Sequence, residues 1–286
     1  MIGKRILITG VTGRLGSRLA ALLENGSNTV MGFDRSALDI TDWATVRQVI
    51  ANAHPDIVIN AAAMTDVDGC ARDPALAHRI NGLGAGNVAA AAYAARALIV
   101  HISTNEVFDG SAARPYREYD APCPINPYGE SKWAGEQAVI RVNPRHVIVR
   151  TAWLFAHGGR NFVHAVLGAA RAGKPLRVVC DEVANPTYTY DLADAIITLA
   201  QAERPGIYHL VNEGTTTRSA FARRILDRSG YADTPITPIL RAQWPRPSCP
   251  PAHAALDNTA AALLGIRLRP WDAALDSFLE REGLLA

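Results

Sequence analysis

The sequence predicts an α/β fold built on a doubly wound parallel sheet, and two observations support this prediction. Short runs of aliphatic residues alternate with segments of helical spacing through the first half of the 286-residue chain. The runs lack the alternation of polar and apolar residues that marks a half-exposed strand, so both faces of each strand are expected to be buried. Such strand–helix alternation brings the carboxyl ends of parallel strands to one edge of the sheet, where ligands bind.

The elements of the first half follow one another closely. The short aliphatic and β-branched runs favour strands, whereas the longer segments between them repeat apolar residues at the period of a helix. We expect strands at residues 5–9, 29–33, 56–60, 98–103 and 146–151. We expect helices at residues 14–24, 41–53, 73–95 and 127–142.

The second half is less regular. There we expect helices at residues 161–172, 190–202 and 218–229, and strands at residues 176–180 and 206–211. Residues 244–251 are rich in proline and cannot add a central strand, because proline has no amide hydrogen to donate. We expect this segment to form a lid over a pocket, with a recognition segment for another protein as the alternative.

These elements group into two parts. Residues 1–155 form a first domain, to which residues 176–212 are expected to return. Residues 156–175 and 213–286 form a smaller carboxy-terminal lobe. We expect the smaller lobe to close over the first domain.

The composition excludes several classes of protein. The formal net charge is +2, which gives neither a basic footprint for nucleic acid nor a surface that attracts a membrane. The four cysteines and eight histidines show no metal-ligand spacing, so we expect free thiols, a reducing compartment and no metal site. The apolar run near the amino terminus is too short for a secretory signal. The alanine-rich stretch 87–100 is interrupted by Arg96, so we do not expect it to span a bilayer. A soluble, cytoplasmic protein is expected.

The first strand and the first helix are joined by a glycine-rich turn with the sequence Gly10-Val11-Thr12-Gly13-Arg14-Leu15-Gly16. Its first glycine permits the tight turn, the second lets the backbone approach a pyrophosphate, and the third lets helix and strand pack closely. The helix amino terminus adds unpaired N–H groups and a partial positive charge. The turn therefore predicts a dinucleotide site, with contacts expected from Gly10, Thr12, Gly13, Arg14, Leu15 and Gly16.

Residues after the second and third strands extend this site. Asp34 ends the second strand, where a carboxylate accepts hydrogen bonds from the adenosine ribose, and this favours NAD(H). Arg35 beside it can pair with a 2′-phosphate, so NADP(H) stays open. Small residues after the third strand let the backbone lie against the cofactor, although simple close packing also explains them; these are Ala61, Ala62 and Ala63.

Tyr128 and Lys132 are four positions apart and share one face of a predicted helix. We expect the ammonium to stabilise the phenolate and so to lower the tyrosine pKa towards working pH. Tyr128 can then give its proton to a carbonyl oxygen as hydride arrives at the carbon. An ordinary surface pair is the alternative, but this helix follows the fourth strand at the edge that carries the glycine turn.

Thr104 is expected at the end of the fourth strand, where its hydroxyl would polarise the carbonyl. Ser103 is not chosen because it alternates towards the other face of the strand. A β-branched strand residue with a satisfied hydroxyl is the alternative reading of Thr104.

These motifs together resemble those of the dTDP-4-dehydrorhamnose reductases, a branch of the extended short-chain dehydrogenase/reductase superfamily. The resemblance covers essentially the whole chain in order and rests on the glycine turn, Asn60-Ala61-Ala62-Ala63, Ser103-Thr104, Val107-Phe108-Asp109-Gly110, Tyr128-Gly129-x-x-Lys132, Arg150-Thr151-x-Trp153, Asn185-Pro186-Thr187 and Arg246-Pro247. It implies a Rossmann domain with a smaller lobe that binds a nucleotide sugar. The implied reaction is NAD(P)H-dependent reduction of the 4-keto group of a dTDP-linked 4-keto-6-deoxyhexose, which gives dTDP-L-rhamnose. A homodimer is compatible with this resemblance.

The resemblance also implies roles for residues at the cofactor. Thr104, Tyr128 and Lys132 match the catalytic trio of the family. Asp39 and Ile40 look like the aspartate and aliphatic pair that holds the adenine ring. For Asp39, a helix cap or a solvated turn is an equally good explanation.

Other matches lie towards the substrate. Thr65 and Val67 match positions on the cofactor and substrate sides, and Trp153 matches the residue that packs on the sugar. Asn161 and Arg246 fall near positions expected to meet the nucleotide.

The chain departs from the family pattern in two places. Asn105 and Glu106 stand where the family usually has Asp and Tyr, and Met64 stands where it commonly has His. A Thr-Asp-Glu run characterises nucleotide-sugar 4,6-dehydratases, in which the Asp is the acid and the Glu the base. An amide cannot deliver a proton, so Glu106 looks like half of that set. We expect Asn105 and Glu106 to form the pocket wall, with Glu106 binding a sugar hydroxyl.

Two other functions stay open. Glu106 motivates a nucleotide-sugar epimerase or dehydratase of the same superfamily, which would turn over without net change in the cofactor. The second is a non-catalytic NAD(P)-binding regulatory subunit, as in the relative that attaches to methionine adenosyltransferase. The complete set of Thr104, Tyr128 and Lys132 argues against a protein that only binds.

Overall fold

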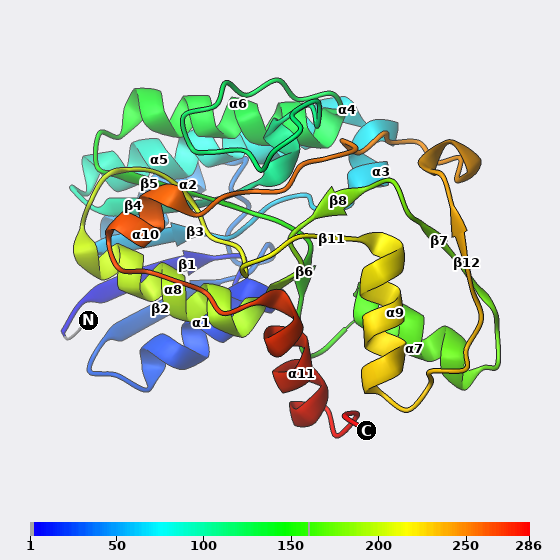
Figure 1. Ribbon diagram of the computed structural model, residues 1–286. Coiled ribbons are helices and arrows are strands. Elements are labelled where there is room, and N and C mark those ends of the chain that lie inside the picture. Colours follow the sequence, from blue (N-terminus) through cyan, green and yellow to red (C-terminus); the bar gives the residue numbers. More distant parts are fainter. Residues whose placement is uncertain (1–2, 160) are drawn as a thin grey trace.

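The computed structural model describes residues 3–159 and 161–286 (Figure 1). At its centre lies a parallel sheet with the strand order β10-β5-β4-β3-β1-β2. Its strands are β1 (Arg5–Thr9), β2 (Thr29–Phe33), β3 (Ile57–Asn60), β4 (Leu98–Thr104), β5 (His146–Thr151) and β10 (Gly206–His209). The order reverses direction between β1 and β3, so a crevice opens there at the carboxyl ends of the strands. The predicted doubly wound α/β fold is confirmed.

Helices cover both faces of this sheet (Figure 1). On one face α1 (Arg14–Glu24) packs against α8 (Thr189–Ala202), and on the other α5 (Ala85–Ala94) packs against α2 (Trp43–Ala53) and α6 (Pro127–Val142). Alternate side chains of β1 enter the two resulting cores: Ile6 and Ile8 enter one and Leu7 the other. This two-sided burial explains why the strands are continuously apolar.

The helix predicted at 73–95 is wrong as a single element. The chain instead forms α3 (Val67–Arg72), α4 (Pro74–Ala77), a π-helix at His78–Gly84 and then α5. Asn81 in the π-helix accepts a hydrogen bond from the Met64 N–H (2.8 Å) and donates to the Met64 carbonyl (3.0 Å). The wider π turn thus carries a side chain that fixes the segment after β3, which matches the frequent use of such turns near functional sites.

The smaller lobe is built from α7 (Phe162–Arg171), α9 (Arg218–Arg228) and α11 (Trp271–Arg281). They enclose a core that includes Phe155, Phe221 and Phe278. Short two-stranded pairs tie the lobe together: β6 (Leu154–Phe155) with β9 (Thr187–Tyr188), β7 (Leu176–Val179) with β12 (Ile236–Ile239), and β8 (Val183–Ala184) with β11 (Thr216–Thr217). Short helices complete the fold: Asn105–Val107, Arg241–Gln243 and α10 (Thr259–Leu263).

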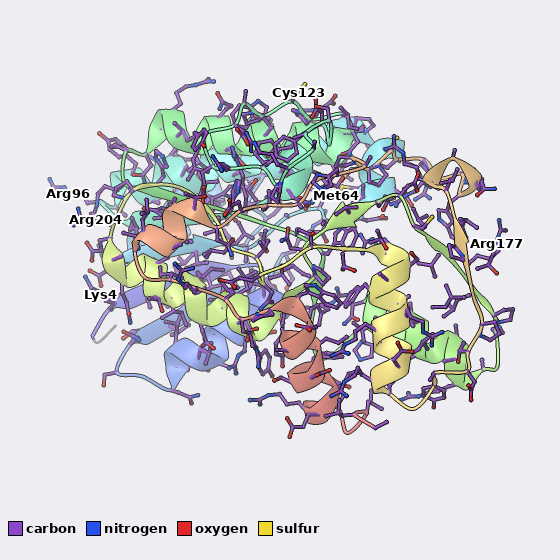
Figure 2. The ribbon with its side chains drawn as sticks, in the orientation of Figure 1. Lys4, Met64, Arg96, Cys123, Arg177 and Arg204 are labelled. Atoms are coloured by element: carbon purple, nitrogen blue, oxygen red, sulfur yellow. The ribbon has the colours of Figure 1, made fainter. Side chains whose placement is uncertain are left out.

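The lobe boundaries differ from the expected ranges in two places. Within residues 176–212, α8 and β10 join the large sheet layer, but β7 pairs with β12 in the lobe. Within residues 213–286, α10 packs on β10 of the large sheet. The side chains in Figure 2 mark the two ends of the molecule, with Lys4 and Arg204 far from Arg177 in the lobe. In the described part of the chain, no helix has the length and apolar character that a bilayer span requires.

Candidate functional site

A cavity of about 1080 Å³ opens at the carboxyl edge of the large sheet. It gathers most of the predicted site residues, namely Gly10, Thr12, Gly13, Arg14, Leu15, Gly16, Arg35, Asp39, Ile40, Ala61, Ala62, Ala63, Thr65, Val67, Thr104, Asn105, Glu106, Tyr128, Lys132 and Trp153. Three predicted residues do not line it: Asp34, Asn161 and Arg246. Residues from five strand ends therefore meet in one space, as the edge of a parallel sheet requires.

The glycine turn lies at the crevice between β1 and β3. Gly10 has a φ of +71°, and a Cβ there would lie 2.8 Å from the Ala62 backbone. A Cβ on Gly16 would lie 2.2 Å from the Gly10 carbonyl oxygen. The N-cap residue of α1 is Gly13, which has no side chain that could accept hydrogen bonds from the first-turn amides. The first turn of α1 therefore presents backbone N–H groups and the positive end of its dipole, a combination suited to phosphates.

Asp34 and Arg35 after β2 are both expected at the cofactor, but of the two only Arg35 lines the cavity. The Asp34 carboxylate accepts hydrogen bonds from the Ser36 N–H (2.9 Å), the Ser36 hydroxyl (2.6 Å) and the Ala37 N–H (3.0 Å), and these bonds lower its pKa. This carboxylate closes its own turn and does not line the cavity, whereas Arg35 does. That Asp34 faces the cofactor stays a prediction; in this structure local N–H and O–H donors engage its Oδ1 atom.

Tyr128 lies in the first turn of α6, and the residues around it set where the helix begins and how closely it packs. The Asn126 side chain accepts a hydrogen bond from the Gly129 N–H (2.8 Å), and Pro127 occupies the first helical position. A Cβ on Gly129 would lie 2.0 Å from the Glu106 carbonyl oxygen, so only glycine lets the helix approach this segment. The close approach brings Tyr128 to the wall of the same cavity as Thr104 at the end of β4.

The electrostatics of Tyr128 differ from the prediction. Burial raises the pKa of the phenol, and the Glu106 carboxylate raises it further, while the Thr104 hydrogen bond acts in the opposite direction. The Lys132 ammonium donates to the Ile102 carbonyl (2.6 Å), and burial lowers its pKa to about 8. The phenol pKa is therefore raised and not lowered as expected, because desolvation is the largest influence on it. A protonated phenol suits proton donation.

Ser103 and Thr104 have separate surroundings. Ser103 donates a 2.5 Å hydrogen bond to Glu136, which also binds Arg150 in a buried ion pair of 2.7 Å. Thr104 accepts a hydrogen bond from the Glu106 N–H (3.2 Å) and lines the cavity. Alternation along β4 thus assigns one hydroxyl to a buried network and the other to the cavity.

Asn105 and Glu106 form part of the wall. The Asn105 amide donates to the Ala254 carbonyl (2.9 Å) and so ties the wall to the carboxy-terminal segment. Glu106 accepts a hydrogen bond from Asn126 (2.7 Å), and burial raises its pKa. The Asn105 tether is a contact that no sequence pattern indicated.

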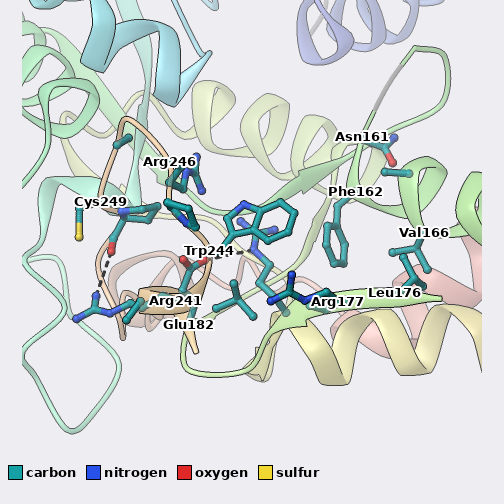
Figure 3. Close-up of a pocket in the computed structure, with 18 residues that line it drawn as sticks. Asn161, Phe162, Val166, Leu176, Arg177, Glu182, Arg241, Trp244, Arg246 and Cys249 are labelled. Atoms are coloured by element: carbon teal, nitrogen blue, oxygen red, sulfur yellow. Dashed lines mark hydrogen bonds and ion pairs between the residues drawn. The ribbon is translucent and has the colours of Figure 1, made fainter. Parts of the chain in front are cut away.

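A second cavity of about 820 Å³ lies in the smaller lobe, between α7, β7 and residues 241–250 (Figure 3). Asn161 and Arg246 line this second cavity, along with the aromatic rings of Phe162 and Trp244. Asn161 caps α7 by accepting from the His164 N–H (3.1 Å). It therefore has a structural contact in addition to its place in the cavity wall.

The proline-rich segment is held across the molecule. Arg246 pairs with Asp68 of α3 at 2.9 Å, and the Ser248 N–H donates to the same carboxylate at 3.2 Å. The segment thus lines the second cavity and is tied to α3 of the larger layer. Sequence reasoning missed Asp68, Glu182 and Arg218, since no local spacing links residues so far apart along the chain.

Comparisons with known proteins agree with this geometry. A family model described as "RmlD substrate binding domain" matches residues 4–283. The dTDP-4-dehydrorhamnose reductase of Mycobacterium tuberculosis (strain ATCC 25618 / H37Rv) is 38% identical, with 96% of this chain and 92% of that protein covered. The spore coat polysaccharide biosynthesis protein SpsK of Bacillus subtilis (strain 168) is also 38% identical, with 96% and 97% covered.

Solved structures of dTDP-4-dehydrorhamnose reductases are also similar to this chain. The crystal structure of a dTDP-4-dehydrorhamnose reductase from Bacillus anthracis in complex with NADP has a TM-score of 0.93 and 34% identity, covering 98% of this chain and all of that one (100%). That from Clostridium acetobutylicum has a TM-score of 0.94 and 36% identity, covering 97% and 99%. The chain belongs to the dTDP-4-dehydrorhamnose reductase family.

Proposed function

We propose that this protein reduces the 4-keto group of a dTDP-linked 4-keto-6-deoxyhexose with NADPH or NADH, converting dTDP-4-dehydrorhamnose to dTDP-L-rhamnose. The observation that carries the proposal is that Thr104, Tyr128 and Lys132 line the same cavity as the glycine turn. The names of the relatives support this substrate class.

The chain's own residues divide the chemistry among them. When bound, the nicotinamide supplies the hydride that reaches the ketone carbon. Tyr128 delivers its proton to the ketone oxygen, and its raised pKa keeps that proton in place until charge develops there. Thr104 orients the ketone by a hydrogen bond, and the Lys132 ammonium offsets the negative charge left on the phenolate.

The cofactor fits the first cavity through its phosphates and its adenosine end. The first-turn amides of α1 would bind the pyrophosphate, and the alanines after β3 would leave room for the nicotinamide side. Arg35 lines the cavity while the Asp34 carboxylate is engaged elsewhere, which favours a 2′-phosphate and hence NADPH. Arg35→Ser should weaken NADPH more than NADH in a fluorescence titration; equal weakening of both would argue against this assignment.

The sugar and the nucleotide occupy different places. Trp153 and Val67 lie at the first cavity and are assigned to the sugar, with Glu106 beside them in the wall. Asn161 and Arg246 line the second cavity and are assigned to the nucleotide, for which Phe162 and Trp244 offer aromatic faces.

A spectrophotometric assay tests the proposal. Oxidation of added NADPH in proportion to the keto-sugar consumed would support reduction. Turnover without net change in cofactor absorbance would favour the epimerase or dehydratase that Glu106 suggests. Binding of NADPH without any turnover would favour a regulatory subunit.

A cytoplasmic location and a homodimer complete the proposal. The location is supported by Cys70, Cys123, Cys180 and Cys249, which are all free thiols. The homodimer rests on the family resemblance. Light scattering of the purified protein would test it, and a monomeric mass would remove it from the proposal.

A further inference from the structure

Arg218 is the one described residue that lines both cavities. Its place follows from the strand pairing of the smaller lobe. Thr217 of β11 lies opposite Val183 of β8. Because the two strands are antiparallel, the residue after Thr217, Arg218, lies beside the residue before Val183, Glu182. Arg218 then opens α9, which holds its backbone at the boundary between the two spaces.

The Arg218 side chain is partly buried between an aromatic ring and two carboxylates. Its guanidinium carbon lies 3.6 Å from the centroid of the Trp153 ring, and its Nε lies 3.8 Å from a Glu182 oxygen. The second carboxylate is that of Glu106, whose charge attracts the guanidinium and favours its protonated form. Stacking occupies the face of the guanidinium and leaves the N–H groups to bond in its plane.

The fully buried Arg150 shows by comparison how loosely Arg218 is paired. Arg150 binds both oxygens of Glu136, with bonds of 2.7 and 3.0 Å. Such a pair has the short bonds of a two-pronged guanidinium–carboxylate contact. The 3.8 Å separation of Arg218 from Glu182 is about an ångström longer than such bonds. Arg218 is thus positioned by its neighbours without being saturated by them.

An elongated ligand must pass Arg218 if it fills both cavities. With its nucleotide in the second cavity and its sugar near Tyr128, a nucleotide sugar crosses the boundary at the diphosphate that joins them. The sugar is attached to the distal phosphate, so that phosphate is the one nearest the first cavity. Planar guanidinium groups bind phosphate oxygens in pairs.

We infer that Arg218 binds the diphosphate of the nucleotide sugar, with its main contact to the distal phosphate, and so sets the position of the sugar relative to Tyr128. The inference rests on the proposed function, because it assumes a nucleotide sugar that spans both cavities. Arg218 is a binding and specificity residue in this scheme and exchanges its loose pairing with Glu182 for phosphate oxygens.

Calorimetric titration with dTDP, dTMP and thymidine tests the inference. Arg218→Met should weaken dTDP by about ten- to a hundredfold, the range for a lost charge-assisted contact, and should weaken dTMP less. Thymidine lacks phosphate, so its affinity should stay within about twofold of the unmodified protein. Arg171→Met, an exposed arginine of α7 outside both cavities, is the matched control and should change none of the three.

Equal effects on dTDP and thymidine, or no effect on dTDP, would overturn the inference and leave the proposed function standing. If the unmodified protein binds none of the three ligands, the proposed function fails and the inference fails with it. Thermal unfolding shows whether Arg218→Met is folded. If it is not, Arg218→Lys keeps the charge without the planar fork, and it should still weaken dTDP several-fold relative to thymidine; an unchanged ratio would again overturn the inference.

Discussion

The two cavities lie side by side but are encoded in different ways. The first is built from short-range patterns, such as the seven residues of the glycine turn and the four-residue spacing of Tyr128 and Lys132. The second depends on residues that meet only after folding, such as Asp68 with Arg246, which are 178 positions apart. A parallel sheet edge gathers local motifs automatically. A lobe built from short strand pairs does not.

Variants at each of the two cavities test this comparison, and Tyr128→Phe in the first cavity should have the largest effect on turnover. Removing the proton donor should lower turnover by about a hundredfold or more, the usual worth of a positioned acid. Affinity for NADPH, measured by fluorescence titration, should stay within a few-fold because the glycine turn is untouched. Unchanged turnover would mean that the phenol has no part in the chemistry.

Gly16→Ala should come next in size. The added Cβ would lie 2.2 Å from the Gly10 carbonyl oxygen, so the turn must move. We expect NADPH affinity to fall by about tenfold or more and the free energy of unfolding to fall by about 1–3 kcal/mol. Gly168→Ala in α7 is the control, because its Cβ meets nothing within 4 Å and should stabilise the helix by about 0.5–1 kcal/mol. Equal NADPH affinities for the two variants would refute the close packing of the turn.

The pH dependence of turnover tests the buried ammonium. The pKa of Lys132 is lowered to about 8, so the side chain is cationic below that pH and neutral above it. Turnover in the reducing direction should therefore fall as the pH rises through about 8, to about half its plateau value there. Lys132→Arg should shift this fall to higher pH, since arginine keeps its proton. A flat profile from neutral pH to well above 8 would contradict this role.

Asp68→Asn should give the smallest effect. The Asp68–Arg246 pair is partly exposed, with side-chain exposures of 27% and 28%, so its loss should cost less than about 1 kcal/mol of stability. The Michaelis constant for the nucleotide sugar should rise by about two- to threefold, because the segment over the second cavity is held less firmly. Asp233→Asn, on an exposed turn, is the matched control. A large fall in turnover at unchanged Michaelis constant would show that Asp68 acts on the chemistry.

The sequence predicted the large sheet and the gathering of most residues at its edge because period and turn chemistry are local properties. It failed where tertiary contacts decide. The π-helix at His78–Gly84 interrupts an unbroken helical pattern, and its Asn81 side chain bonds the Met64 backbone, 17 positions away. Arg218 could not be found, since its role depends on the pairing of β8 with β11.

The direction of the tyrosine pKa was also beyond local reasoning. Spacing places an ammonium one turn away from the phenol, but the Lys132 ammonium is bonded to the Ile102 carbonyl. The extent to which the fold removes Tyr128 from water and the nearness of Glu106 are properties of the folded chain, and they determine the direction of the pKa shift.

The central claim is tested most directly by following the hydride itself. NADPH carrying deuterium at its transferable position would be mixed with the protein and dTDP-4-dehydrorhamnose, and the product sugar analysed by mass spectrometry. We predict that the deuterium appears on the carbon that bore the ketone and that Tyr128→Phe slows its appearance. Conversion of the sugar with the label still on the cofactor would contradict the account.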